Sequence, residues 1–159
     1  MSAESTPLHG SPARAGTLRG VLVTLAWFLP PLAAGLWIAA VTIPGGSLVP
    51  WAPAMIDLDV YRRTGGLLLQ GRDIYAAEGL PWIYPPFAAL FTVPLSWMPL
   101  GVAQVFWIGL TVALLMAMLY RLGLSGWLLS LATTASVVLA EPVRETLGFG
   151  QLGVLLVSA

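Results

Sequence analysis

Cysteine and lysine are absent from this sequence of 159 residues, and histidine occurs only once, as His9. The lack of cysteine excludes disulfides, thiolate zinc sites, iron–sulfur clusters and a cysteine nucleophile. A single histidine excludes a metal site built from several histidines of this chain. Because the net charge is zero and no basic cluster occurs, the electrostatic footprint of a nucleic-acid-binding protein is missing, and we expect no nucleic-acid partner.

Charged residues of either sign are also scarce. They make up 9% of the sequence, whereas soluble domains carry roughly a quarter. Apolar residues make up 58%, and the mean hydropathy is +0.87. So few charges cannot cover the surface of a soluble domain. The composition therefore predicts an integral membrane protein surrounded by membrane lipids.

Long apolar runs supply the expected membrane spans. A helix needs about 20 apolar residues to cross a hydrocarbon core of roughly 30 Å. The runs that meet this length or approach it predict an all-α membrane protein with several transmembrane helices, at about 21–43, 102–120 and 124–140, with the start of another at 152. The apolar segment 87–98 is only 12 residues long and contains Pro94, so we expect a re-entrant or interfacial element there.

Arginine positions predict the orientation of these spans. Residues 1–17 are rich in small and polar residues and predict a disordered tail, which Arg14 and Arg19 would hold in the cytoplasm. Arg121 lies in the turn between two expected spans and belongs on the same side. The loop 44–86 and the segment that follows Ala140 would then lie outside.

The expected outer loop contains half of the charged residues of the chain, all between Asp57 and Glu78. Residues 57–70 place Leu58, Tyr61 and Leu68 near one helical face, with charged side chains elsewhere. This pattern is typical of a helix that lies at the membrane interface.

The sequence Asp57-Leu-Asp-Val-Tyr61 is the densest candidate for chemistry. On a helix, Asp59 precedes Arg62 and Arg63 by three and four residues, so we expect ion pairs there. Asp57 is then left with two interpretations. It either caps the helix N-terminus, or it acts as a general base toward a hydroxyl.

Two further segments suit a lipid-linked sugar. Trp82 and Tyr84 precede Pro85-Pro86; Trp82 is interpreted as part of an interfacial aromatic belt, while Tyr84 can hydrogen-bond a sugar. After Ala140, Arg144 stands between Glu141 and Glu145, where it either binds a phosphate or anchors the loop through those glutamates.

Four short motifs in this order resemble the N-terminal part of glycosyltransferase family 87. They are Asp-x-x-Val-Tyr at 57–61, Gly-Arg-Asp-Ile-Tyr at 71–75, Tyr-Pro-Pro-Phe at 84–87, and Glu-Pro-Val-Arg at 141–144 followed by Gly150-Gln151. The resemblance runs from about residue 20 to the last residue and implies roughly the first two fifths of a family member. A histidine that the family uses in its C-terminal part has no counterpart here.

The resemblance implies a GT-C fold and a polyprenol-phosphate-mannose-dependent alpha-(1→2)-mannosyltransferase of the actinobacterial cell membrane, with its active site outside. Asp57 would be the catalytic base that deprotonates the 2-hydroxyl of a mannose on a glycolipid or lipoglycan acceptor, and transfer would invert the donor. The resemblance implies no metal and no cofactor. As substrate-binding candidates we take the polar residues in or beside the motifs: Asp59, Tyr61, Tyr84, Arg144 and Gln151.

Two other functions suit a multi-pass membrane protein. A transporter or channel subunit would be favoured by charges inside the spans, but the three long apolar runs contain none. A non-catalytic subunit for envelope assembly would not need the Asp57 carboxylate.

Overall fold

The computed structural model describes residues 12–41, 55–76, 79–151 and 153. All regular structure within these ranges is helical, which confirms the predicted all-α membrane fold class. In chain order the elements are α1 (Pro12–Val41), α2 (Ile56–Leu69), the 3₁₀-helix η2 (Pro86–Thr92), α3 (Val93–Ser96), α4 (Leu100–Arg121), α5 (Gly126–Leu139) and α6 (Glu141–Phe149).

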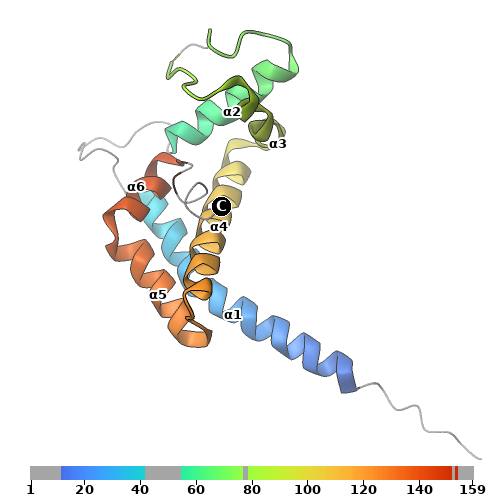
Figure 1. Ribbon diagram of the computed structural model, residues 1–159, viewed down its shortest axis with the longest axis vertical. Coiled ribbons are helices and arrows are strands. Elements are labelled where there is room, and N and C mark those ends of the chain that lie inside the picture. Colours follow the sequence, from blue (N-terminus) through green and yellow to red (C-terminus); the bar gives the residue numbers. More distant parts are fainter. Residues whose placement is uncertain (1–11, 42–54, 77–78, 152, 154–159) are drawn as a thin grey trace, which may run out of the picture.

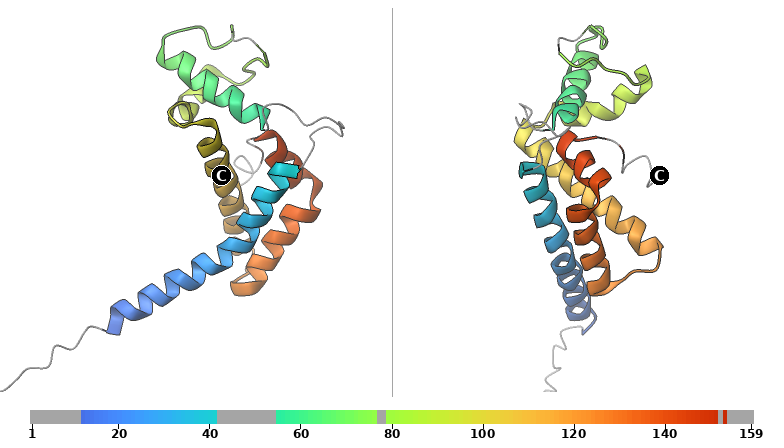
Figure 2. Two further views of the ribbon diagram at one scale, coloured as in Figure 1. Left: turned by 180° about the vertical axis from the view of Figure 1, so that it is seen from behind. Right: turned by 90° about the vertical axis from the view of Figure 1, so that its left-hand side faces the viewer.

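Two of these helices are long and apolar enough to cross a membrane, at Arg19–Ala40 of α1 and Leu100–Arg121 of α4. They run antiparallel and approach closely, because Gly35 of α1 lies against Ile108 and Val112 of α4. Helix α5 packs along α1 and also contacts α4 (Figure 2). These three helices form the body of the molecule.

Helix α1 begins earlier than expected. Residues 12–17, which we assigned to a disordered tail, belong to the helix. Pro12 occupies the first helical position, where its missing N–H costs nothing, and Ala13 and Arg14 are good helix formers. The rest of the expected tail, residues 1–11, and the stretch 42–54 of the expected outer loop lie outside the described residues.

The expected span 124–140 is interrupted. Helix α5 has 14 residues, about 21 Å, and α6 follows at an angle of 74°. Ala140 between them has an extended backbone, and Pro142 in the first turn of α6 lacks the N–H that a continuous helix would require. The two helices form a broken span or a re-entrant pair. The further span expected from 152 falls outside the described residues, apart from Gly153.

Helix α2 lies across the end of the bundle, with η2 and α3 packed against it (Figure 1). The packing is closest at Gly65, where a Cβ would lie 2.6 Å from the Thr92 carbonyl oxygen. Three residues of the segment 87–98 are buried, namely Ala89, Thr92 and Leu95. Its large apolar side chains on the other side, Phe87, Leu90, Phe91 and Trp97, are exposed.

Candidate active site

Asp57 is the second residue of α2. The helix begins at Ile56, and Met55 is the cap residue, with a left-handed backbone (φ 60°) that a long side chain rarely adopts. The hypothesis that Asp57 caps the helix is therefore wrong. The Met55 side chain makes no capping hydrogen bond, and the Asp57 carboxylate, two residues further on, is not the cap.

The Asp57 side chain lines a cavity of about 160 Å³. Tyr61 from the next turn of α2 forms one part of its wall, and Trp82 and Tyr84 from the loop before η2 form another. The cavity thus joins a carboxylate to three aromatic side chains. Asp59 and Arg144 do not line it.

The surroundings of Asp57 change its acidity. Burial raises the pKa of the Asp57 carboxyl above its ordinary value, because the charged form loses solvation, and a hydrogen bond from the Gln151 side chain lowers it in part. At a given pH, a carboxylate with a raised pKa is a stronger proton acceptor than an exposed aspartate.

Gln151 reaches Asp57 because the end of α6 packs on the start of α2. Gly150, just after α6, has φ 74°, and a Cβ at this position would lie 2.9 Å from the Leu58 Cβ. Only a glycine combines this backbone with so close a contact. The two residues of the last shared motif, Gly150 and Gln151, therefore connect α6 to the carboxylate.

The aromatic wall is packed edge to face. The Tyr61 ring lies 6.0 Å from Trp82 and 6.1 Å from Tyr84, measured between centroids, and the Tyr61 and Tyr84 hydroxyls are 3.4 Å apart. Trp82 is only 3% exposed, so its interpretation as part of an interfacial belt is wrong. Its indole N–H has no hydrogen-bond partner among the described residues.

The loop between α2 and η2 holds Tyr84 in place. The Asp73 carboxylate accepts a hydrogen bond of 2.9 Å from the Tyr75 backbone N–H, and the Tyr75 hydroxyl donates one of 3.1 Å to the Tyr84 carbonyl oxygen. Ile74 between them is buried. The motif at 71–75 thus positions the cavity wall, a role that its sequence alone does not reveal.

Asp59 makes the ion pairs that its spacing predicts. Its carboxylate lies 3.1 Å from Arg63 Nε and 3.5 Å from Arg62 Nη1. Arg62 also donates two hydrogen bonds, of 3.1 and 2.6 Å, to the Met98 carbonyl oxygen just before α4. This chain of contacts ties α2 to the start of the α4 span.

Arg144 stands apart from the Asp57 cavity, half-buried on α6. Its Nε is buried without a hydrogen-bond partner, and among the described residues it forms no ion pair with Glu141 or Glu145. The alternative that these glutamates anchor it is therefore not observed.

Comparison with known proteins identifies the family. Residues 82–159 match the model of glycosyltransferase family 87. The chain is 31% identical, over 87% of its length, to a polyprenol-phosphate-mannose-dependent alpha-(1-2)-phosphatidylinositol mannoside mannosyltransferase of Mycolicibacterium smegmatis. It is 30% identical, over 99% of its length, to the protein of the same description from Mycobacterium tuberculosis. This chain belongs to glycosyltransferase family 87.

The match covers only part of those relatives. The family 87 chain spans 37% of the M. smegmatis protein and 41% of the M. tuberculosis protein. A second M. smegmatis relative, a polyprenol-phosphate-mannose-dependent alpha-(1-2)-phosphatidylinositol pentamannoside mannosyltransferase, is 35% identical over 70% of the chain and 30% of its own length. No solved structure matches the chain.

Proposed function

We propose that this chain takes part in mannosyl transfer from polyprenol-phosphate-mannose to the 2-hydroxyl of a mannose on a glycolipid or lipoglycan. The names of its relatives support the donor, the alpha-(1-2) linkage and a lipid acceptor. The observation that carries the proposal is the Asp57 carboxylate, which lines an aromatic cavity at the end of a membrane helix bundle.

In this proposal Asp57 is the general base. Its carboxylate takes the proton of the acceptor 2-hydroxyl while the oxygen forms a bond to the anomeric carbon of the donor. The bond between that carbon and the phosphate oxygen breaks, and its electron pair leaves with the polyprenyl phosphate. Attack opposite the leaving group inverts a beta-linked donor to an alpha product.

The environment of Asp57 supports this role. Burial raises the pKa of the Asp57 carboxyl, and the Gln151 amide orients it through a hydrogen bond. The raised pKa suits a base that must accept a proton from a weakly acidic hydroxyl, and the hydrogen bond fixes the direction of its carboxylate. Gln151 thereby acts on the acceptor substrate indirectly, through its hydrogen bond to Asp57.

The aromatic wall is the proposed sugar-binding surface. The Tyr84 hydroxyl is the polar group of this wall that a sugar can contact. Tyr61, which is buried, supports Tyr84 from behind, and Asp59 fixes α2 through its arginines. We therefore assign Tyr61 and Asp59 to positioning, and Tyr84 to direct contact.

Arg144 is the proposed partner of the donor phosphate. Its Nε lacks an acceptor, and a guanidinium binds phosphate oxygens through a planar pair of N–H groups. Positive charge near the departing phosphate would stabilise the charge that develops there.

The site is proposed to face the outside of the cell membrane. Arg19 and Arg121 end the two spans on the side of the bundle opposite α2. Since arginines favour the cytoplasmic side, Asp57 would lie outside, where a lipid-linked donor can present its sugar.

Substitution of each aspartate tests the base. In membranes that carry the complete protein, Asp57→Asn should lower mannosyl transfer at least about 100-fold, because general base catalysis contributes this much. Asp59→Asn should retain most of the transfer, since a partly exposed ion pair contributes little. The measurement is the incorporation of labelled mannose from polyprenol-phosphate-mannose into lipid.

The amount of folded protein serves as the control for both variants. Equal losses at both positions, together with loss on chelator treatment, would replace the base by a metal-binding pair. Full mannosyl transfer by Asp57→Asn would instead show that Asp57 is not the base.

A further inference from the structure

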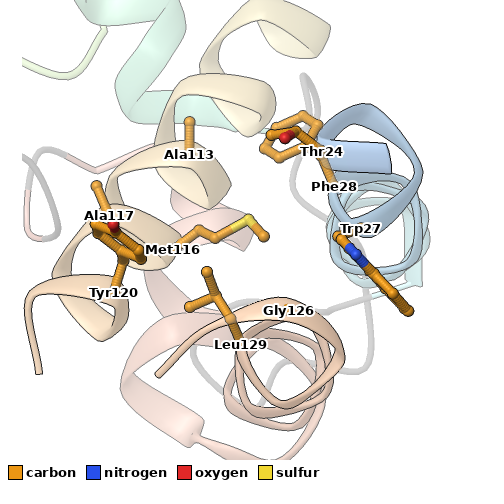
Figure 3. Close-up of a pocket in the computed structure, with 9 residues that line it drawn as sticks. All are labelled: Thr24, Trp27, Phe28, Ala113, Met116, Ala117, Tyr120, Gly126 and Leu129. Atoms are coloured by element: carbon orange, nitrogen blue, oxygen red, sulfur yellow. The ribbon is translucent and has the colours of Figure 1, made fainter. Parts of the chain in front are cut away.

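A second cavity, of about 370 Å³, lies at the end of the bundle away from α2, between α1, α4 and α5. Figure 3 shows side chains of all three helices directed toward it. The larger residues that line it are Trp27, Phe28, Met116, Tyr120 and Leu129.

The lining of this cavity is apolar in effect. The Thr24 hydroxyl is used within its own helix, where it donates a hydrogen bond of 3.0 Å to the Gly20 carbonyl oxygen. Ala113 and Ala117 face the space with small side chains. Tyr120 is 64% exposed and Trp27 38%, so the cavity opens on the outer surface of the spans.

Positive charge lies at the same end of the spans. Arg121 directly follows Tyr120, and Arg19 precedes Thr24 by five residues, about 8 Å along the helix. The segments 19–40 and 100–140 contain no acidic residue. In the described part of the chain, neither arginine has an ion-pair partner. Neither arginine lines the cavity, but both lie at the end of the spans where it is found, and positive charge at that level of a membrane favours a lipid with a negative headgroup.

We propose that this cavity holds one acyl chain of an anionic phospholipid in the leaflet opposite Asp57, with the phosphate attracted to Arg19 and Arg121. Van der Waals packing against three helices would favour the chain over bulk lipid, since apolar burial alone gives no preference inside a membrane. The arginines would select the headgroup. The site is separate from the proposed sugar site and does not depend on it.

Lipid binding to the purified chain tests the cavity. The chain is reconstituted in bilayer discs of dioleoyl phosphatidylglycerol and dioleoyl phosphatidylcholine, and retained lipid is measured by native mass spectrometry. We expect one retained phosphatidylglycerol. Ala117→Leu, which places a larger side chain in the cavity, should lower retention, and Ala33→Leu on an exposed part of α1 outside the cavity should preserve it.

The arginines are tested by headgroup selection. Arg19→Gln and Arg121→Gln should each lower the preference for phosphatidylglycerol about fivefold, the effect of about 1 kcal/mol per charge. Arg72→Gln in the loop after α2 should leave the preference unchanged. Helical content by circular dichroism checks that each variant folds.

Three results would overturn the proposal. Equal retention by the Ala117→Leu and Ala33→Leu variants would show that the cavity holds no lipid. Equal retention of the two phospholipids by the unaltered chain would remove the charge selection. Displacement of phosphatidylglycerol by a polyprenyl phosphate would assign the cavity to an isoprenoid tail.

Discussion

At the scale of single residues, the two aspartates in the first turn of α2 meet different surroundings. Asp59 lies beside two arginines, whereas Asp57 lines a cavity and receives a hydrogen bond from Gln151. The difference arises because the two side chains point about 200° apart around the helix. One faces the bundle end and α6, and the other faces its own following turn.

The surroundings of Asp57 predict how mannosyl transfer depends on pH. A base acts only when ionised, so transfer should fall as the pH falls through the raised pKa of Asp57, above the ordinary value of 3.8. Gln151→Leu removes the hydrogen bond that lowers this pKa, so the acidic limb of the pH–rate profile should move to higher pH. Gln70→Leu, at the exposed far end of α2, is the matched control. If the acidic limb of the pH–rate profile stays in place in Gln151→Leu, Gln151 does not affect the pKa of the base.

The same pKa shift predicts that Asp57→Asn does not destabilise the fold. Because folding raises the pKa of Asp57, ionisation costs stability as the pH rises through the folded-state pKa. Asparagine cannot ionise and avoids this cost. The variant should therefore unfold at a temperature equal to or above that of the unaltered chain at neutral pH, so its loss of transfer would not arise from misfolding.

Substitution of Arg144 distinguishes a role in phosphate binding from a structural role. If it binds the donor phosphate, Arg144→Lys should raise the donor KM at least about tenfold, because an ammonium cannot reproduce the planar pair of N–H groups. The yield of folded protein should stay unchanged. A donor KM equal to that of the unaltered protein would rule out the phosphate contact.

At the scale of elements, close contacts at two glycines fix α2 to its neighbours. Gly65 touches the carbonyl of Thr92 in η2, and Gly150 touches Leu58. These contacts hold α2 across the end of the bundle, and they place Asp57 beside the end of α6. The exposed apolar side of η2 and α3 then suits the membrane interface.

Two adjacent glycines of α2 provide a matched test of this packing. Gly65→Ala would place its Cβ 2.6 Å from a backbone oxygen, so the helix must shift, at a cost of about 1–3 kcal/mol. Gly66→Ala meets open space and should stabilise the helix by about 0.5–1 kcal/mol. Thermal unfolding in detergent should thus move in opposite directions for the two variants. A similar loss at both positions would contradict the close contact.

At the scale of the whole molecule, the two ends of the bundle differ in chemistry. One end has α2, α6 and the Asp57 cavity, and the other has Arg19, Arg121 and the apolar cavity. If the proposed orientation is right, residues at the first end are accessible from outside the cell and residues at the second end from the cytoplasm.

Because the chain has no cysteine, single introduced cysteines can report this orientation without background. Glu141→Cys should react with a membrane-impermeant maleimide added to intact cells, and Arg121→Cys should react only after the membrane is permeabilised. The cysteine-free chain is the control. The reverse pattern would place Asp57 in the cytoplasm and remove the proposed access to an outward-facing donor.

Features that depend on neighbours along the chain follow from composition and spacing. The apolar runs predict α1 and α4, and the spacing of Asp59 from two arginines predicts their ion pairs, since residues three and four apart share one side of a helix. Asp57, Tyr84 and Gln151 were recognisable as candidates by their motifs.

Features that depend on contacts between distant segments required the folded chain. Nothing local indicates that Trp82 is buried or that Gly150 brings Gln151 to Asp57. Each arises where a surface of one helix meets a surface formed elsewhere in the chain. Whether two such surfaces fit together depends on how their side chains pack in three dimensions. Hydropathy and residue spacing describe one segment at a time, so they do not predict this fit.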